Sequence, residues 1–140
     1  MGNLSDHFNK KDFACKCGHC NGKFKISLGI VGALELVSAH FRKRVFVIYG
    51  FKCPEALDPL NVNKSYHALG KAADFRVEGV QLDTVFKFVR TLPELTGVGF
   101  YPKEQFVHID IREKEKDEWV FENNKYVTLT DEKRAQYNLA

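Results

Sequence analysis

Residues 106–111 read Phe-Val-His-Ile-Asp-Ile, and this short stretch decides the fold. Its period-two alternation predicts a β-strand that carries Phe106, His108 and Asp110 on one face and aliphatic side chains on the other. A histidine and an aspartate therefore share one face of an otherwise apolar strand. Buried polar groups of this kind need a hydrogen-bond partner or a metal ion. We expect this strand to belong to the core sheet and to a functional site at once.

The surrounding sequence predicts strands and helices in mixed order. The expected elements are a helix from Leu28 to Phe41 capped by Ser27, a buried strand Val45–Tyr49, a loop over 51–64, a strand Ala72–Val77, a helix Val80–Leu92, a strand Val98–Tyr101, a hairpin of Trp119–Phe121 and Tyr126–Leu129, and a short helix after Thr130. This order indicates an α+β domain with one mostly antiparallel central sheet flanked by helices.

Length and composition favour one domain over residues 1–140, in which residues 1–25 form a Cys-rich irregular segment packed on the rest. The hydrophobic fraction of 44% is enough to build a core. A net charge of +3 and a pI near 8.6 fall short of the basic stripe that is typical of nucleic-acid binding. We expect no export signal and no membrane span, because the sequence has neither a leader-like start nor a long apolar run.

A second polar group precedes the strand Ala72–Val77. Residues 65–74 read Ser-Tyr-His-Ala-Leu-Gly-Lys-Ala-Ala-Asp and contain His67 and Asp74, with Gly70 available for a chain reversal between them. Together with His108 they form a His-Asp-His set, the ligand number of a catalytic zinc site that leaves its fourth position open for water. Residue types alone leave the alternative open that each is an ordinary core histidine or a turn aspartate.

The four cysteines form a different pattern. Cys15, Cys17 and Cys20 lie in a tight C-x-C-x-x-C group, and Cys53 is far along the chain. This spacing favours a structural zinc site, with His19 as a spare ligand, over the dispersed pattern of a disulfide-rich secreted protein. Reduced thiols or disulfides around a loop are the alternatives.

These motifs together resemble a known family. The pattern S-x-H-x-x-G-x-A-x-D at 65–74, followed by F-V-H-x-D at 106–110, resembles the M15 family of zinc D-alanyl-D-alanine peptidases, which shares its fold with the hedgehog signalling domain. Three further stretches match in order: F-A-C-K-C-G at 13–18, Y-G-F-K-C-P at 49–54 and G-V-G-F-Y-P at 97–102. The resemblance implies a catalytic Zn²⁺ held by His67, Asp74 and His108.

The implied activity is hydrolysis of peptidoglycan stem peptides at D-alanine by a metal-activated water, in the manner of a D-Ala-D-Ala carboxypeptidase. Lys52 lies where many members of the family carry an arginine that holds the terminal carboxylate of the substrate. A lysine offers a point charge in place of a two-pronged fork, so this position weakens the carboxypeptidase assignment. Ser65 and Tyr66 border the site and are expected to donate hydrogen bonds to the substrate or the oxyanion, with packing as the alternative role of Tyr66.

The general base is a departure from the family pattern. Many relatives carry a glutamate or aspartate three residues before the last histidine, whereas Gln105 occupies that place here and cannot accept a proton. Asp110 is our first candidate, either as the carboxylate that acts on the water or as a partner that fixes an imidazole. Glu104 is the second candidate for the catalytic carboxylate.

Several functional hypotheses stay open at this stage. The resemblance also admits a murein endopeptidase that cuts crosslinks, and Gln105 favours a noncatalytic zinc-containing domain that binds peptidoglycan. A Cys-rich interaction module, with its only metal at the cysteines, is a third class. We expect a monomer that acts on the bacterial cell wall through a periplasmic or phage-lysis route and is otherwise cytoplasmic.

Overall fold

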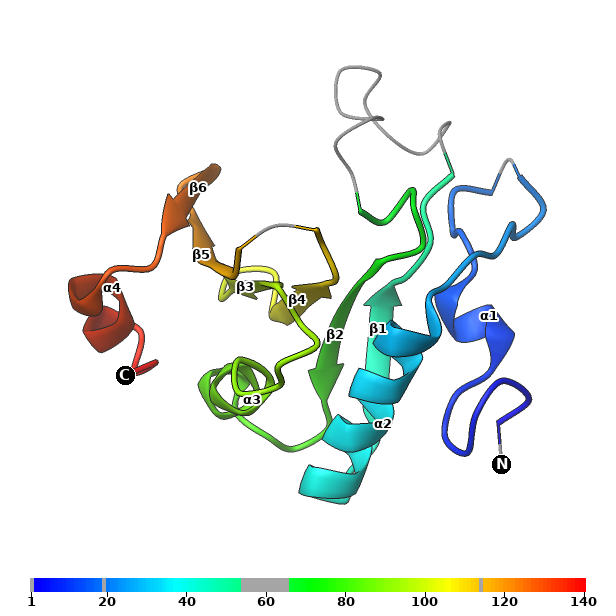
Figure 1. Ribbon diagram of the computed structural model, residues 1–140, viewed down its shortest axis with the longest axis horizontal. Helices are drawn as coiled ribbons and strands as arrows, with labels where there is room; N and C mark the ends of the chain where they lie inside the picture. Colours follow the sequence, from blue (N-terminus) through cyan, green and yellow to red (C-terminus); the bar gives the residue numbers. More distant parts are fainter. Residues whose placement is uncertain (1, 19, 54–65, 114) are drawn as a thin grey trace.

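The computed structural model describes residues 2–18, 20–53, 66–113 and 115–140 (Figure 1). In these ranges the chain forms the strands β1 (Val45–Tyr49), β2 (Ala72–Val77), β3 (Gly97–Tyr101), β4 (Phe106–Asp110), β5 (Asp117–Glu122) and β6 (Lys125–Thr128), and the helices α1 (Lys10–Phe13), α2 (Leu28–Phe41), α3 (Leu82–Val89) and α4 (Asp131–Gln136). The strands make one six-stranded sheet in the order β1-β2-β4-β3-β5-β6. Neighbouring strands are antiparallel except β3 and β5, which are parallel. The predicted α+β domain with a mostly antiparallel sheet is confirmed.

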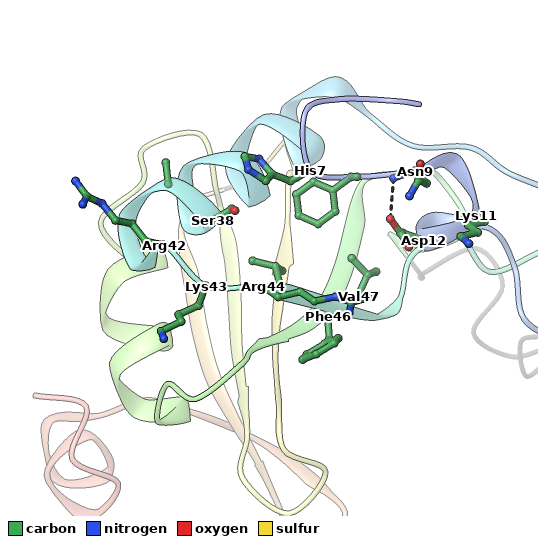
Figure 2. A pocket seen from close by; sticks show the side chains of 13 residues that line it. His7, Asn9, Lys11, Asp12, Ser38, Arg42, Lys43, Arg44, Phe46 and Val47 are labelled. Carbon is green, nitrogen blue, oxygen red and sulfur yellow. Dashed lines mark hydrogen bonds between the residues drawn. The ribbon is translucent and has the colours of Figure 1, made fainter. Parts of the chain in front are cut away.

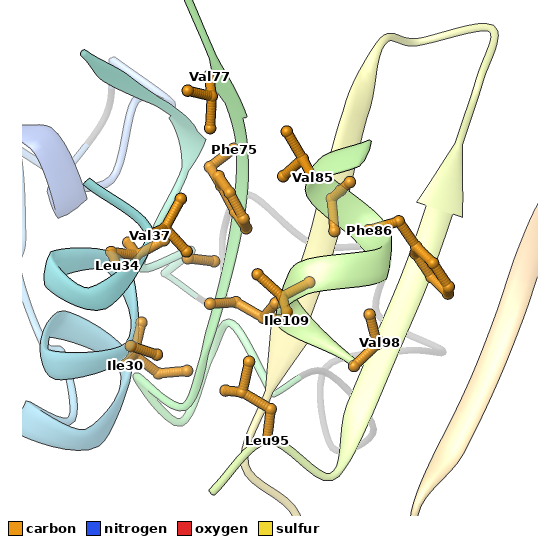
Figure 3. Close-up of a cluster of buried hydrophobic side chains, with 14 of the residues drawn as sticks. Ile30, Leu34, Val37, Phe75, Val77, Val85, Phe86, Leu95, Val98 and Ile109 are labelled. Atoms are coloured by element: carbon orange, nitrogen blue, oxygen red, sulfur yellow. The ribbon is translucent and has the colours of Figure 1, made fainter. Parts of the chain in front are cut away.

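The core lies between one face of this sheet and the helices α2 and α3 (Figure 3). Alternation in β4 sends Val107 and Ile109 into the core, and β2 contributes Phe75 beside them. From the helices, Leu34 and Phe86 reach the same cluster, and all five side chains are completely buried. Burying one large apolar side chain stabilises a fold by about 1.5–3 kcal/mol, so this cluster holds the sheet and helices together.

The helix ends follow the capping residues of the sequence. Ser27 precedes α2, and its hydroxyl accepts a hydrogen bond from the Gly29 amide at 3.2 Å. Helix α2 ends at Phe41, and the C-cap residue Arg42 adopts a left-handed conformation with φ 54°. Thr130 caps α4 by accepting from the Lys133 amide. The predicted positions of Ser27 and Thr130 as N-caps are confirmed.

Some local predictions were wrong. The strand β1 was predicted to be buried, but it is an edge strand with partly exposed side chains, and Tyr49 is 41% exposed. Its regular register with β2 breaks between Val47 and Tyr49. Helix α3 is shorter than the predicted Val80–Leu92. Val80 and Leu92, at the two ends of the predicted range, lie outside α3 and pack partly buried against the core. After α3 the chain continues in turns, in which the amide of Thr91 donates to the carbonyl of Phe88 and that of Leu92 to the carbonyl of Val89.

The N-terminal segment is more ordered than its composition suggested. It contains the short helix α1, and both Phe8 and Phe13 are buried in the core cluster. Helix α1 packs beside β1, the edge strand of the sheet (Figure 1). Most of the predicted loop over 51–64, together with Ser65, lies outside the described residues. No helix in the described part of the chain is long and apolar enough to cross a membrane.

Candidate metal centre

The sheet brings the polar residues of two strands together on the face opposite the helices. Asp74 in β2 pairs directly with His108 in β4, and His108 pairs with Gly99 in β3. Side chains on directly paired residues of neighbouring strands point to the same face. His67 reaches this row from the turn that precedes β2. One ligand atom from each of His67, Asp74 and His108 lies within 4.8 Å of the others.

His67 has its tautomer fixed by the main chain. Its Nδ1 donates a hydrogen bond to the carbonyl oxygen of Gly50 at 2.7 Å. Because a carbonyl oxygen can only accept, the proton of a neutral imidazole has to stay on Nδ1. The lone pair of Nε2 then faces Asp74, whose Oδ2 is 3.4 Å away. This arrangement of a histidine is typical of metal ligands.

His108 lies between two carboxylates. Its Nδ1 is 2.8 Å from Oδ1 of Asp74, and its Nε2 is 2.7 Å from Oδ2 of Asp110. Burial lowers the pKa of His108, but the hydrogen bonds to Asp110 and Asp74 outweigh burial and raise that pKa to about 9. Burial acts to raise the pKa of Asp74, yet the charges and hydrogen bonds of His67 and His108 hold it well below its usual range. Asp74 is therefore an anion with an imidazole on either side.

The donor set fits a divalent metal ion. In a tetrahedral zinc site with ligand bonds near 2.0–2.1 Å, neighbouring ligand atoms are about 3.4 Å apart. The separation between Nε2 of His67 and Oδ2 of Asp74, 3.4 Å, matches this value, whereas Nδ1 of His108 is at a hydrogen-bond distance of 2.8 Å from the other oxygen, Oδ1. All three side chains are at least nine-tenths buried, and buried charges need a partner of opposite sign. An ion bonded to Nε2 of His67, a carboxylate oxygen of Asp74 and Nδ1 of His108 would meet that need.

Asp110 supports His108 and does not face the three ligand atoms. It is completely buried, and Arg112 donates to it from Nε at 2.8 Å and from its terminal amino group at 2.5 Å. These bonds and the bond to His108 hold the pKa of Asp110 below its usual range against the effect of burial. A Cβ atom on Gly97, which pairs with Asp110, would lie 2.1 Å from that carboxylate. Glycine at this position leaves room for the carboxylate.

The aromatic side chains of Trp119 and Tyr66 lie beside the site. The ring of Trp119 in β5 lies 5.3 Å from that of His108, and a Cβ atom on Gly99 would come within 2.6 Å of the indole. The guanidinium of Arg112 lies over the rings of Tyr66 and Trp119, at 4.6 Å and 5.1 Å. Such contacts restrict the arginine while its two donors hold Asp110.

Sequence reasoning missed Arg112, Trp119 and the two strand glycines. The alternation that selected His108 and Asp110 reaches Arg112 in one further step of two residues. Gly99 lies inside the predicted strand Val98–Tyr101 and Gly97 directly precedes it, and glycine in a strand is itself a sign of close approach. For Trp119 we find no signal beyond its being the single tryptophan of the chain.

The residues predicted to contact substrate have different positions. Lys52 lies beside the site: its Nζ is 4.3 Å from the centre of the Tyr49 ring, and its amide donates to the carbonyl of His67. Tyr49 in turn pairs with Asp74 across the strands. Tyr66 packs on Arg112, as described above, and Ser65 lies outside the described residues.

One acid and one amide side chain lie in the turn between β3 and β4, shortly before His108. Glu104 and Gln105 are both exposed there. Gln105 has a left-handed backbone with φ 64°, and its side-chain amide donates to the carbonyl of Pro102. Gln105 is thus used to close the turn.

Two other features lie elsewhere in the described structure. A pocket of about 670 Å³ is found between the N-terminal segment, the end of α2 and β1, and it contains none of the three ligands (Figure 2). Its rim carries Arg42, Lys43 and Arg44, while Asn9 and Asp12 are bonded to each other by the cap of α1. The second feature is the group of four cysteines, whose ligand atoms also cluster.

Comparison with known proteins agrees with the geometry. The family model described as peptidoglycan L,D-endopeptidase MepK (Peptidase_M15_2) matches residues 33–117, more than half of the chain. The chain belongs to this M15 peptidase family. The matched residues include all three ligands, Asp110 and Arg112. The resemblance found in the motifs is confirmed at the level of the M15 family, whereas D-Ala-D-Ala carboxypeptidase specificity is not supported.

Individual M15 relatives give the same result over a shorter region. Peptidoglycan L,D-endopeptidase MepK of Escherichia coli strain K12 is 37% identical over 75 residues, which cover 49% of this chain and 41% of that protein. The probable peptidoglycan L,D-endopeptidase MepK of Haemophilus influenzae is 48% identical over 46 residues, or 33% of this chain and 24% of that protein. The chain therefore spans less than half the length of these relatives. No solved structure matches it significantly.

Proposed function

We propose that the chain is a metal-dependent peptidoglycan endopeptidase that cuts crosslinks at a bond between an L- and a D-configured residue. One observation carries the proposal: His67, Asp74 and His108 converge with buried ligand atoms inside the segment that matches the M15 family. Three protein ligands leave one position for water, as in catalytic zinc sites. Zinc bound there would activate that water as a nucleophile and polarise the scissile carbonyl.

The choice of an endopeptidase over a D-Ala-D-Ala carboxypeptidase rests on two points. The relatives that match this chain are named peptidoglycan L,D-endopeptidases, that of Haemophilus influenzae as a probable one. A carboxypeptidase has to hold a free terminal carboxylate, and Lys52 lacks the two-pronged geometry that an arginine would bring to that task. Lys52 can instead attract carboxylates along a crosslinked stem peptide. Its ammonium group lies over the ring of Tyr49, and Tyr49 pairs with Asp74 on the neighbouring strand.

Protein groups around the ion have separate tasks in this proposal. The Gly50 carbonyl keeps the proton of His67 on Nδ1 and leaves its Nε2 lone pair free to hold a metal ion, and Asp74 would neutralise part of the charge of such an ion. Asp110 positions His108 by binding its far nitrogen, and Arg112 keeps Asp110 ionised. Since both oxygens of Asp110 are engaged, Glu104 is the remaining candidate for carrying a proton to the leaving amine.

A noncatalytic peptidoglycan-binding domain is the second candidate. It is favoured by the two observations that Gln105 closes a turn and that Asp110 is committed to His108 and Arg112. In that case the metal would hold the surface in shape, and the domain would bind muropeptides without cleaving them.

The experiment that decides between these functions uses purified muropeptide dimers. L,D-crosslinked and D,D-crosslinked dimers are incubated with the zinc-loaded chain, and products are identified by mass spectrometry. We expect monomers from L,D-crosslinked dimers with wild type and none with His67→Ala. The matched control is His40→Ala, which removes an exposed histidine on α2 and should leave cleavage unchanged.

Three outcomes would contradict the proposal. Release of a terminal D-alanine without monomers would restore the carboxypeptidase assignment. Retention of the dimers on the protein without any product would support the binding domain. Equal cleavage by wild type and His67→Ala would place the chemistry at another site.

A further inference from the structure

The four cysteines are brought together although they lie far apart in sequence. Cys15, Cys17 and Cys20 come from the segment after α1, and Cys53 follows β1. The four Sγ atoms all lie within 4.8 Å of one another. The Sγ atom of Cys17 is 3.6 Å from that of Cys20 and 3.5 Å from that of Cys53.

These separations suit a metal ion better than covalent sulfur pairs. A disulfide requires about 2.05 Å between its sulfur atoms, much less than either distance. Tetrahedral zinc with bonds to sulfur near 2.3 Å separates neighbouring sulfur atoms by about 3.8 Å. The observed spacing is close to the second value. Cys15 and Cys53 are also buried, at 6% and 0% exposure, and Cys17 and Cys20 are half-buried.

The backbone around the cluster supports thiolates. The amide of Cys53 donates to Sγ of Cys15 at 3.3 Å, and the amide of Lys23 donates to Sγ of Cys20 at 3.4 Å. Amide donors directed at sulfur stabilise its ionised form, which is the form that binds metal. The chain turns between Cys17 and Lys23, where Gly18, Asn21 and Gly22 adopt left-handed conformations with φ of 81°, 56° and 70°.

The cluster is joined to the segment that orients His67. Cys53 lies three residues after Gly50, whose carbonyl accepts from His67. Between them, the amide of Phe51 donates to the carbonyl of Phe13 at 2.8 Å, and the amide of Lys52 donates to the carbonyl of His67 at 3.3 Å.

Lys16 adds a second connection. It lies between the first two cysteines, and its ammonium group donates to the carbonyls of Val47 and Ile48 on the edge of β1. Movement of the cysteine segment would therefore be transmitted to the end of β1 and to the Gly50 carbonyl.

We propose that Cys15, Cys17, Cys20 and Cys53 bind a structural zinc ion, which fastens the N-terminal segment to residues 50–53 and thereby positions His67. Zinc binding at the cysteines does not rest on the proposed hydrolysis, because four protein ligands leave no position for water or substrate. Its effect on the other centre is indirect and acts through Gly50.

The test measures metal binding to the full chain purified under reducing conditions. Zinc content by atomic emission should be two per chain in wild type, one in Cys17→Ser/Cys20→Ser and one in His67→Ala/His108→Ala. After exchange with cobalt, wild type and the histidine variant should show thiolate-to-metal charge-transfer absorption, and the cysteine variant should not. Lys11→Ala is the matched control, because it removes an exposed lysine of the same N-terminal segment that belongs to neither metal site.

The coupling has its own measurement. In the cysteine variant we expect the zinc affinity of the remaining centre to fall by about tenfold, the size of effect that lost outer support of a ligand produces. Hydrogen exchange at the Phe51 and Lys52 amides should accelerate in the same variant. Unchanged affinity and unchanged exchange would refute the positioning role while leaving the zinc site itself intact.

A readout on the wild type alone keeps the proposal testable if the cysteine variant does not fold. All four thiols should resist alkylation until a chelator removes the metal and should then react together. A cobalt spectrum without thiolate bands, or thiols that pair as disulfides under reducing conditions, would overturn the proposal. Neither result depends on whether the chain cleaves peptidoglycan.

Discussion

Replacing Asp110 with asparagine separates the two roles that a carboxylate two residues after His108 can have. The substitution keeps the shape of the side chain but removes its charge. An asparagine amide has one accepting oxygen and one donating NH₂ group. The NH₂ group would face either the Nε2 proton of His108 or the guanidinium of Arg112, so two donors would meet at the completely buried position 110. The variant thus loses one charge-assisted hydrogen bond and leaves a buried donor unsatisfied.

The expected magnitude follows from these contacts. A hydrogen bond to a charged group contributes about 1.5–3 kcal/mol, and loss of an outer partner of a metal ligand lowers metal affinity by about 10–100-fold, or 1.4–2.7 kcal/mol. The two estimates agree. We therefore expect Asp110→Asn to raise the dissociation constant for zinc by about 10–100-fold while the turnover rate at saturating zinc changes much less.

The assay is a zinc titration against a chromophoric chelator, followed by muropeptide cleavage at saturating zinc. Asp117→Asn is the matched control: it removes the other carboxylate near Arg112, which is 50% exposed and 3.7 Å from the guanidinium. That control should bind zinc as wild type does. If Asp110→Asn bound zinc normally but turned over about 10²–10⁴-fold more slowly, Asp110 would be the general base and our reasoning would be refuted.

Three further predictions concern the same centre. Gly97→Ala should weaken zinc binding at least as much as Asp110→Asn, because its Cβ would overlap the Asp110 carboxylate at 2.1 Å, and normal zinc affinity in a titration would contradict this. In protein freed of metal by a chelator, the carboxylates of Asp110 and Asp74 raise the pKa of His108 from the ordinary 6.5 to about 9. The ion pairs of His108 therefore stabilise the fold fully below pH 6.5, and this stabilisation is lost as the pH rises through 9, a decline that denaturant unfolding should show. Because His108 carries a proton at pH 7 that zinc has to displace, zinc binding at that pH should release a proton. Lys52→Ala should raise KM for muropeptides about five- to tenfold with kcat nearly unchanged, whereas Lys52→Arg should keep KM low; a fall in kcat alone would show that Lys52 does not bind substrate.

The centre of the fold could be predicted from sequence because its signals are local. The alternation in residues 106–111 indicates both the strand and its two faces, and β4 lies in the middle of the sheet with Val107 and Ile109 in the core. Ser27 and Thr130 mark helix starts by a hydrogen bond within a few residues. Such signals do not depend on the rest of the chain.

The exposure of β1 could not be predicted in the same way. A run of β-branched and aromatic residues has the same composition in a central strand and in an edge strand. Whether Tyr49 is covered depends on which strand pairs outside it, and in this sheet β1 is at the edge. That information is contained in the order of strands and not in the run itself.

In the candidate site, too, some features could be predicted from local sequence and others could not. His67, Asp74 and His108 could be selected from residue types and spacing, and the structure brings them together. The role of Asp110 stayed open, because alternation places it beside His108 without saying which nitrogen it meets. The structure shows that Arg112 donates hydrogen bonds to both oxygens of Asp110, and that the lack of a side chain at Gly97 leaves room for this carboxylate.

The most direct test of the central claim is the anomalous scattering of crystals grown with zinc, measured above and below the zinc absorption edge. We predict an anomalous peak within about 2.0–2.2 Å of Nε2 of His67, a carboxylate oxygen of Asp74 and Nδ1 of His108, with one remaining position not filled by protein. Absence of a peak among these three side chains, or a fourth protein ligand closing the coordination, would contradict the account.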